Sequence, residues 1–503
     1  MFLLRKKMLF TLMMLISAAF AQAQAQTQTN TSSQFLALAD FHFNPFSYCS
    51  PQKVPCETVS ALRAGNPTGP ATDKNSWLAI FAQMPPQAPS SLGSDTNETL
   101  LDLTLNYLET LPVNYDFITV NGDFIAHHFS SQFAQYSGLD PNSPEYATQY
   151  QAFVRQTFEY LQYRLQQVFP SSSIYISLGN NDSYDGDYVY SPDRLGPDNF
   201  YHEMMHIWDA SIMDNANQRS FDATFEKAGY YAITVPENDP SSANRILFLN
   251  TNLYSAKDTQ GAGTRVPLAA QQQLDWLKSQ LEDIRKHKGH AILVYHISNG
   301  ADNYASASAG APVMLWGIKN GHDYNQAFTQ LIQDYKDVIS STMTAHFHMD
   351  GFQFLRETPK DRGILDTFVN GISPNNYSNP GFKLYQYDPA NLMLNNFQTW
   401  YFNDTGAQGN TFWSKEYDFN EHYQPTCASH GECDLSKGYR LIKADIDNEN
   451  TRLYVTLYSA GAGPIDKASW LPYYWCATQH QLDKAYAACL KIETAPTLGH
   501  KSN

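Results

Sequence analysis

Aspartate, asparagine and histidine residues recur in this chain directly after short apolar segments, each of which is typical of a buried strand. The residues after these segments can bind a cation through carboxylate, amide or imidazole groups. In chain order they are Asp40, His42, Asp123, Asn180, His296, His346 and His348. In open α/β sheets, binding sites form outside the carboxyl ends of the strands. The pattern therefore predicts that these side chains, far apart in the sequence, meet in one crevice.

The ligand types indicate which metals such a site would bind. A ligand set of carboxylate oxygen, imidazole nitrogen and amide oxygen suits Zn²⁺, Mn²⁺ or Fe better than a soft, all-thiolate set would. Asp40 and His42 are two positions apart, as are His346 and His348, so each pair lies on one side of an extended segment. Asp123 can bridge two ions with its two oxygens. Two neighbouring cations can hold a hydroxide and clamp a phosphoryl group during in-line displacement, so the residues predict hydrolysis of phosphate esters.

The segments that must position these residues alternate between strand-like and helix-like patterns. We expect strands at 35–39, 116–120, 174–178, 246–249, 291–295 and 342–345, and helices at 98–111, 145–169 and 268–287. Alternation of this kind predicts an α/β layered fold. After about residue 404, Gly, Asn and Cys become more frequent, and four tryptophans lie at or beyond Trp400. We expect a small, disulfide-tied and partly helical C-terminal region there.

The N-terminus has the features of a secretory signal. Arg5, Lys6 and Lys7 precede an apolar stretch at 8–20, and an A-x-A cleavage site follows at 21–23 or 23–25. We therefore expect a signal peptide over 1–25, a disordered lead-in over 26–34, and a secreted, periplasmic or extracellular protein without stable membrane insertion after signal removal. The alternative is an uncleaved membrane anchor, for which the apolar stretch is short.

The six cysteines fit an oxidising compartment. Among the possible connectivities, proximity in the sequence favours three local pairs, and the alternative is that some thiols are free and buried. The predicted pairs are Cys49 with Cys56, Cys427 with Cys433, and Cys476 with Cys489.

The formal charge of −16 argues against a broad basic surface that binds duplex nucleic acid. An anionic substrate would need a local positive centre, which bound cations would supply. We expect a small phosphate ester as the partner, and the sequence makes no prediction of the oligomeric state. His202, His206 and His322 are interpreted as structural or surface residues.

The order of the motifs resembles that of the calcineurin-like metallophosphoesterases: D-x-H, G-D-x-x-x-H, G-N-[HN]-D, H and H-x-H. Further segments are similar to the acid sphingomyelinase-like phosphodiesterase branch. They are 38–42, 122–127, 250–254, 273–277, 379–382 and 385–388. The resemblance covers about residues 36–400. It implies a layered β-sandwich flanked by helices, the metallophosphoesterase fold, with the catalytic domain at 35–404 and the cysteine-containing region at 405–503.

The resemblance also implies a division of the ligands between two divalent ions, with Zn²⁺ favoured and Mn²⁺ or Fe as alternatives. One ion would take Asp40, His42, Asp123 and His348, and the other would take Asp123, Asn180, His296 and His346. Ala345 stands where the family usually has Gly, a small change that leaves the expected site intact.

Two further residues are predicted to act on the substrate. His127 matches the family histidine that approaches the phosphate, where it stabilises charge or protonates the leaving oxygen. Asn181 occupies a position that is often His in the family, and an amide can donate a hydrogen bond but cannot deliver a proton. We therefore expect His127 to be the acid and Asn181 to contact substrate, with turn formation as the alternative role of Asn181. Asp182 is expected to hold the loop or to orient a ligand.

The resulting functional hypothesis is a secreted binuclear-metal phosphodiesterase in which a metal-bridging hydroxide attacks soluble nucleotide-like or phosphocholine-like esters. Sphingomyelinases that attack membrane lipid resemble this chain but carry a saposin-type domain, and only the signal and lead-in precede Phe35 here. We therefore favour a soluble substrate. The first alternative is an endopolyphosphatase or nucleotide phosphatase with the same metals, since G-N-N-D also occurs there. The second is a non-catalytic secreted binding protein.

Overall fold

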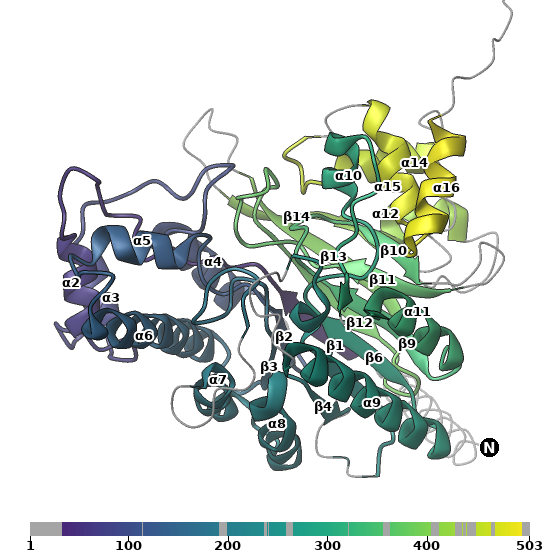
Figure 1. Ribbon diagram of the computed structural model, residues 1–503, viewed down its shortest axis with the longest axis horizontal. Helices are drawn as coiled ribbons and strands as arrows, with labels where there is room; N and C mark the ends of the chain where they lie inside the picture. Colours follow the sequence, from purple (N-terminus) through teal and green to yellow (C-terminus); the bar gives the residue numbers. More distant parts are fainter. Residues whose placement is uncertain are drawn as a thin grey trace, which may run out of the picture. The chain divides into compact units, whose positions relative to one another are not determined.

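The computed structural model (Figure 1) describes residues 33–494 with several gaps. The gaps are 113, 191–198, 236–238, 240, 258–264, 320, 356–362, 404–411, 428–434, 436–438, 440–448 and 464–467. The predicted signal peptide lies outside the described residues, as does Cys433 of the predicted Cys427–Cys433 pair.

The first sheet has six strands in the order β14-β13-β12-β1-β2-β3. Its strands are β1 (Ser33–Leu38), β2 (Ile118–Asn121), β3 (Ile174–Ser177), β12 (Gly381–Tyr387), β13 (Leu394–Asn403) and β14 (Phe412–Asp418). β1, β2 and β3 run parallel, with Leu36 opposite Ile118 and Ile118 opposite Ile174. β12, β13 and β14 form antiparallel pairs. The carboxyl ends of the three parallel strands therefore share one edge of the sheet.

The second sheet also has six strands, in the order β10-β11-β9-β6-β5-β4. Its strands are β4 (Tyr231–Thr234), β5 (Arg245–Leu249), β6 (Ala291–Tyr295), β9 (Ile339–Thr344), β10 (Phe352–Leu355) and β11 (Ile364–Phe368). The central four run parallel, and β4 and β10 close the two edges as antiparallel strands. β7 (Ile318–Lys319) and β8 (His322–Asp323) form a separate short hairpin.

The two sheets pack face to face, and the alternation of side chains along β5 shows how. Ile246 and Phe248 belong to the same hydrophobic core as the first sheet, whereas Leu247 and Leu249 pack into a second core on the opposite face. Tyr231 of β4 joins the sheets at their edges. Its hydroxyl donates to the carbonyl oxygen of Ile176 on β3 and accepts from the Ile176 nitrogen, both at 2.8 Å.

Helices cover both outer faces of the sandwich. α4 (Glu98–Thr110) and α6 (Pro144–Val168) share a core with the first sheet, and α9 (Arg265–Lys286) and α11 (Tyr324–Asp334) share the second core (Figure 1). Both helices of the first pair begin at a capping side chain, because Asn97 accepts from the Leu100 nitrogen and Ser143 from the Tyr146 nitrogen.

Shorter helices complete the described part of the chain. They are α2 (Glu57–Ala64), α3 (Trp77–Ala82), α5 (Phe129–Tyr136), α7 (Phe200–Trp208), α8 (Asn215–Ala228), α10 (Asn303–Ala309), α12 (Phe419–Cys427), α14 (Glu449–Leu457), α15 (Leu471–Ala477) and α16 (Asp483–Glu493), with the 3₁₀ segments η2 (Asp209–Ser211), η3 (Thr251–Tyr254) and η4 (Ala468–Trp470). Among the residues described, no helix combines the length and the apolar composition needed to cross a membrane.

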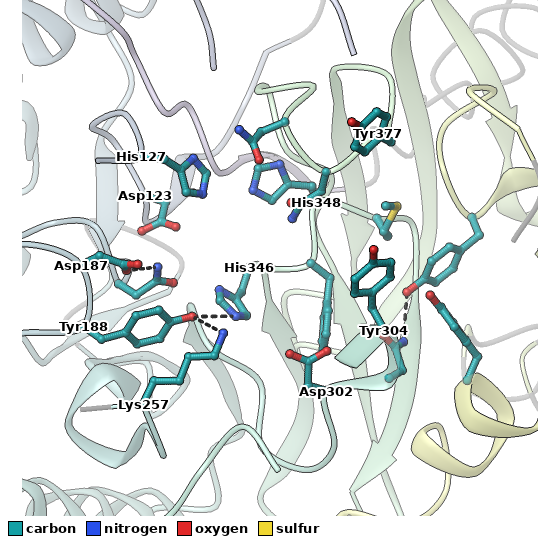
Figure 2. A pocket seen from close by; sticks show the side chains of 18 residues that line it. Asp123, His127, Asp187, Tyr188, Lys257, Asp302, Tyr304, His346, His348 and Tyr377 are labelled. Atoms are coloured by element: carbon teal, nitrogen blue, oxygen red, sulfur yellow. Dashed lines mark hydrogen bonds between the residues drawn. The ribbon is translucent and has the colours of Figure 1, made fainter. Parts of the chain in front are cut away.

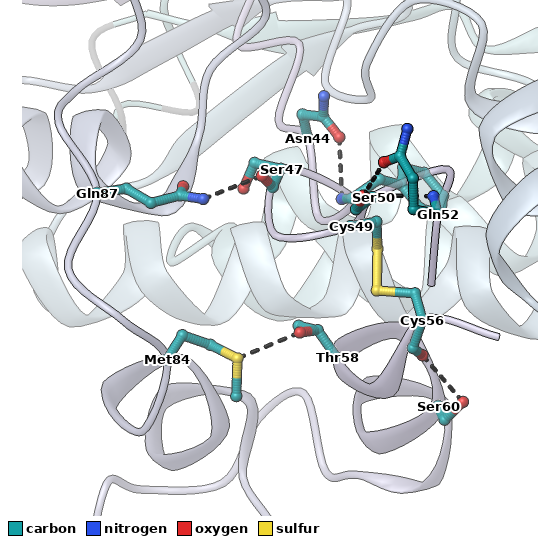
Figure 3. Close-up of a disulfide and its surroundings, with 11 residues drawn as sticks. Asn44, Ser47, Cys49, Ser50, Gln52, Cys56, Thr58, Ser60, Met84 and Gln87 are labelled. Atoms are coloured by element: carbon teal, nitrogen blue, oxygen red, sulfur yellow. Dashed lines mark hydrogen bonds between the residues drawn. A yellow bond between two sulfur atoms is a disulfide. The ribbon is translucent and has the colours of Figure 1, made fainter. Parts of the chain in front are cut away.

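Two disulfides close local loops. Cys49 pairs with Cys56, which immediately precedes α2, and Figure 3 shows this bridge beside the hydrogen bond from Gln87 to the Ser47 carbonyl. Cys476 pairs with Cys489 and ties α15 to α16 in the C-terminal region. These two of the three predicted pairs are confirmed.

The predicted fold class is confirmed: two sheets are flanked by helices, and a disulfide-tied helical region follows them. The structure adds two details. β1 begins at Ser33, two residues before the predicted strand, and β14 lies beyond the boundary predicted after residue 404. Because β14 pairs with β13, the first sheet extends past that boundary.

Candidate metal centre and cleft

The predicted ligands converge where the parallel strands of both sheets end. Asp40, His42 and His348 present ligand atoms that all lie within 4.8 Å of one another, and Asp123, His296 and His346 form a second such group. The two groups meet at the Asp123 carboxylate, whose Oδ2 lies 3.3 Å from the Nε2 atoms of both His42 and His296. Asp123 therefore occupies the position that a bridging ligand requires.

Asn180 joins the second group through its amide oxygen. Its Oδ1 lies 3.2 Å from His296 Nε2, while its Nδ2 donates to Asp187 Oδ1 at 2.8 Å. Because a carboxylate can only accept from the amide nitrogen, Asp187 turns the Asn180 oxygen toward the cluster.

Backbone carbonyls orient three of the four imidazoles. The Nδ1 atoms lie 3.2 Å from the Ile125 carbonyl for His42, 2.7 Å from that of Asn121 for His296, and 3.0 Å from that of Ser373 for His348. Donation from Nδ1 turns each Nε2 toward the cluster, so that in the neutral ring Nε2 is the atom with the lone pair that a metal would take. His346 differs, because its Nε2 lies 3.4 Å from the Tyr188 hydroxyl (Figure 2).

The backbone itself is unusual at the site. Five of the seven predicted ligands have a positive φ, a conformation that side-chain-bearing residues seldom adopt. The angles are 49° for Asp40, 41° for His42, 57° for Asp123, 71° for His346 and 63° for His348. Such conformations concentrate at functional sites, where the surrounding structure holds them in place.

The buried charges of the cluster fit a bound cation. Asp40 is fully buried, and neither of its carboxylate oxygens has a hydrogen-bond partner among the described residues. Burial raises its pKa well above the usual value, so the carboxylate lacks compensation that a cation would provide. Burial also lowers the pKa of His348 to about 3 and that of His346 well below its usual value. These imidazoles are held neutral, the form that binds metal.

The charges around Asp123 act in the opposite direction. Burial alone would raise its pKa, but His296 and His42 hold it well below the usual range. Burial alone would lower the pKa of His296. The charge and hydrogen bond of Asp123 have a larger combined effect and raise that pKa to about 9. The cluster therefore contains a stable carboxylate at its centre, and it can hold metal ions.

Asp182 fixes the two loops that carry Asp123 and Asn180. Its Oδ2 accepts from the backbone nitrogens of Asp123 and Gly179, and its Oδ1 accepts from Phe124, all at 2.8 Å. Gly179 is required by the same close approach, because a Cβ there would lie 2.1 Å from Asp123 Oδ1.

Asn181 lies behind Asp123 and not in the wall of the cleft. It is 4% exposed, its Nδ2 donates to Asp123 Oδ2 at 3.0 Å, and its backbone nitrogen donates to Asp123 Oδ1 at 2.8 Å. The contact with Asp123 was not predicted from the sequence. Through this contact Asn181 can hold the carboxylate in place.

His127 stands beside the cluster, with its ring stacked on that of His42 at a centroid distance of 4.0 Å. Its Nδ1 donates to Asp95 Oδ1 at 2.7 Å, and its backbone nitrogen donates to Asp95 Oδ2 at 2.9 Å. Asn375 also donates to Asp95, at 3.1 Å. Burial would lower the pKa of His127, but the hydrogen bond and charge of Asp95 raise it. His127 is therefore favoured as a protonated imidazole.

The sequence analysis missed Asp95, which lies in the loop before α4 and follows no strand. The one local signal was an acidic residue two positions before the helix-capping Asn97, and such residues are common. The partnership between Asp95 and His127 depends on tertiary packing over 32 residues.

A cleft of about 430 Å³ opens onto the cluster (Figure 2). Asp123, His127, Asn180, His346 and His348 line its inner end. Six aromatic side chains line part of the remaining wall, and two of them come from the C-terminal region. These aromatic residues are Tyr188, Tyr304, Phe347, Tyr377, Tyr458 and Tyr474.

Lys257 is the lysine of the cleft wall, and the sequence analysis did not single it out. Its Nζ lies 3.3 Å from the Tyr188 hydroxyl and 4.9 Å from the centre of the Tyr188 ring. Asp187 and Asp302 also line the cleft, so its wall without metals carries both signs of charge.

Comparison with known proteins finds no matching family model but several relatives. The chain is 27% identical over 358 residues to human acid sphingomyelinase-like phosphodiesterase 3b, covering 68% of this chain and 71% of that protein. It is 26% identical over 268 residues to human cyclic GMP-AMP phosphodiesterase SMPDL3A, covering 52% of this chain and 54% of that protein. It is 23% identical over 424 residues to sphingomyelinase phosphodiesterase C of Dictyostelium discoideum, covering 80% and 84%.

Among solved structures, the chain is similar to PhoD with a TM-score of 0.40 and 10% identity, covering 77% of this chain and 69% of PhoD. The three sequence relatives are phosphodiesterases by name, and each is aligned over half or more of this chain. The chain is therefore a homologue of the acid sphingomyelinase-like phosphodiesterases and a phosphoric ester hydrolase.

Proposed function

We propose that this protein is an exported phosphodiesterase that uses two divalent cations, with Zn²⁺ favoured, to cleave soluble phosphate diesters. The observation that carries the proposal is the position of Asp123, 3.3 Å from both His42 and His296 and between two groups of ligand atoms. One ion would take Asp40, His42, Asp123 and His348. The other would take Asp123, Asn180, His296 and His346.

When bound, the cations would supply Lewis acidity, which lowers the pKa of water and neutralises charge on the phosphoryl oxygens. The chain's own residues then bind the ester and handle the proton. His127 lines the cleft beside His42, and its Nδ1 is committed to Asp95. Its Nε2 therefore carries the proton that the leaving oxygen receives. Asp95 keeps the imidazole protonated and aligned.

The cleft supports a substrate with an apolar or aromatic group beyond the phosphate. Tyr304 and Tyr377 are 60% and 70% exposed and offer ring faces on the side away from Lys257. Nucleobases and quaternary ammonium groups both bind such faces. A nucleotide-like or phosphocholine-like ester therefore fits better than a long polyphosphate, because Asp187 and Asp302 would repel a polyanion along the wall.

Export is part of the proposal. The two described disulfides need an oxidising compartment, and residues 1–25 carry the signal-peptide pattern. The oriented pair of Asp95 and His127 supports catalysis over the alternative of a non-catalytic binding protein, which would not need it.

The proposal is tested by pairing a metal measurement with a leaving-group series. The metal-depleted enzyme should be inactive and should regain turnover as two equivalents of Zn²⁺ or Mn²⁺ bind. His127→Asn should lower kcat by about 10²–10⁴-fold on an alkyl ester of phosphocholine, and by less on bis-p-nitrophenyl phosphate, whose leaving group needs no proton.

His128→Asn is the matched control, because His128 is the neighbouring exposed histidine and Asn tolerates its left-handed backbone. It should keep full activity. If His127→Asn lowered kcat by the same factor on both esters, His127 would not be the general acid. Full turnover without bound metal would refute the metal mechanism. Comparing these esters with ATP and polyphosphate separates the phosphodiesterase from the nucleotide phosphatase and the endopolyphosphatase.

A further inference from the structure

Two histidines lie close together on α7, away from the residues that line the cleft. The Nε2 atoms of His202 and His206 are 3.1 Å apart, and their ring planes are nearly perpendicular, at 88°. The two residues are four positions apart in the helix, so both side chains lie on the same face. Neither residue contributes to the catalytic chemistry described above.

Glu226 of α8 fixes the proton on one of these rings. Its Oε1 lies 2.7 Å from His202 Nδ1, close enough that Nδ1 carries the proton and donates it to the carboxylate. The lone pair of His202 then sits on Nε2 and points at His206. A carboxylate that accepts from the distal nitrogen of a histidine is the arrangement that orients histidines bound to metals.

The spacing of the two nitrogens matches a metal chelate. With Zn–N bonds of 2.0–2.1 Å, two imidazoles on a tetrahedral ion are about 3.3–3.4 Å apart, and on a square-planar ion about 2.8–3.0 Å apart. The observed 3.1 Å lies between these values. Binding requires only that the shared proton leaves and that a cation takes its place.

The surroundings of the pair favour a cation. Asp222 lies one turn before Glu226 on α8, whereas Glu203, the neighbour of His202 on α7, is already paired with Arg155 at 3.9 Å. The Oδ1 of Asp222 is buried without a hydrogen-bond partner among the described residues. Burial raises the pKa of Asp222, with a contribution from Asp209, while His206 opposes the shift, which places His206 within electrostatic reach of this carboxyl.

We propose that His202 and His206, with Glu226 as the positioning carboxylate, form a surface site for a borderline transition-metal ion such as Zn²⁺, Cu²⁺ or Ni²⁺. The site is separate from the catalytic centre. The side chain of His202 is 31% exposed and that of Glu226 is 50% exposed, so solvent reaches the site and water completes the coordination. The ion would strengthen the link between α7 and α8, because metal-bound His202 donates more strongly to Glu226.

The test uses the untagged, full chain with its catalytic centre already loaded, and measures Zn²⁺ binding by equilibrium dialysis with metal quantification. The wild-type protein should bind one equivalent more than the doubly substituted His202→Asn, His206→Asn protein. Phosphodiesterase turnover should be the same in both proteins. Glu226→Gln should keep the site but weaken its affinity by about 10–100-fold.

His287→Asn is the matched control, because His287 also pairs with a carboxylate one turn away, Asp283 at 3.3 Å, but among the described residues it forms no contact with a second imidazole. It should retain the additional equivalent. With Cu²⁺ added to the zinc-loaded protein, the electron paramagnetic resonance spectrum should show coupling to two nitrogens that His206→Asn reduces to one. An unchanged metal count in the double variant, or a spectrum that the substitution leaves unaltered, would overturn the proposal.

Discussion

The Asp95 carboxylate holds His127 at two points, accepting from the ring Nδ1 at 2.7 Å and from the backbone nitrogen at 2.9 Å. The first contact sets the tautomer and the second sets the place of the residue along the loop. Together they point Nε2 of His127 away from Asp95. In the proposed mechanism, the proton for the leaving group would be held on a ring that these two contacts fix in orientation.

Asp95→Asn should therefore lower kcat by about tenfold or more, and by less than the loss of His127 itself. The amide keeps the shape of the carboxylate but cannot stabilise a charged imidazole. KM and the number of bound metal ions should remain close to wild type, and both are measured in the same preparation. Asp140→Asn, at an exposed position, is the control. Loss of metal from the Asp95 variant would instead assign this residue to the metal centre.

Asn181→Ala should weaken metal binding by roughly tenfold, because the amide that steadies Asp123 Oδ2 at 3.0 Å is removed. Competition with a chelator of known affinity measures the change. If Asn181 contacts substrate, as the sequence indicated, KM should rise while metal affinity stays constant. The two roles therefore give opposite results in the same pair of measurements.

Lys257→Gln should change substrate preference more than turnover. The lysine lies on the cleft wall beside Tyr188, where it can contact an anionic group beyond the scissile phosphate. We expect KM to rise by about tenfold for an ester with a second phosphate, such as ATP, and to change little for bis-p-nitrophenyl phosphate. Equal changes in KM for both substrates would show that Lys257 does not bind the second phosphate.

Asp366 should make stability depend on pH. It is fully buried, its Oδ2 accepts from Gln353 at 2.8 Å and Thr344 at 3.2 Å, and burial raises its pKa to about 7. The folded pKa exceeds the unfolded value of about 3.9. The stabilising contribution is therefore complete below about pH 4 and is lost as the pH rises to about 7, by up to about 1.4 kcal/mol per pH unit.

Asp366→Asn cannot ionise, so its free energy of unfolding should fall less between pH 5 and pH 8 than that of the wild type. Urea unfolding at both pH values gives the comparison. Asp334→Asn, at an exposed position of α11, should keep the wild-type dependence. Identical slopes for Asp366→Asn and the wild type would contradict the buried-carboxyl explanation.

The sequence predicts the strands that carry the site because these strands are buried on both faces. The strand at 291–295 is predicted and observed with the same bounds. Its residues form a continuous apolar run, which is typical of a parallel strand buried on both faces. The helix predicted at 98–111 ends one residue earlier, at Thr110. Polar residues at the ends of parallel strands then converge by topology, which is why the cluster could be expected without coordinates.

The residues that the sequence did not reveal act through tertiary contacts. Asp95 precedes a helix and Lys257 follows the short η3 segment, so neither stands at a strand end. Tyr458 and Tyr474 reach the cleft from the C-terminal region, more than 100 residues after His348. No periodic pattern connects these positions with the ligands, and only the packing of the folded chain brings them together.

The hydroxyl of Tyr231 forms hydrogen bonds with both the backbone nitrogen and the carbonyl oxygen of Ile176. These two bonds connect β4 of the second sheet with β3 of the first. Asp123 follows β2 of the first sheet and His296 follows β6 of the second, and 3.3 Å separates Asp123 Oδ2 from His296 Nε2. A slip of one residue along a strand displaces a side chain by about 3.3 Å, which is as large as that distance itself. A tyrosine hydroxyl at the edge of a sheet, outside the cleft, thus contributes to the alignment of the two groups of ligand residues that the proposed cations would share.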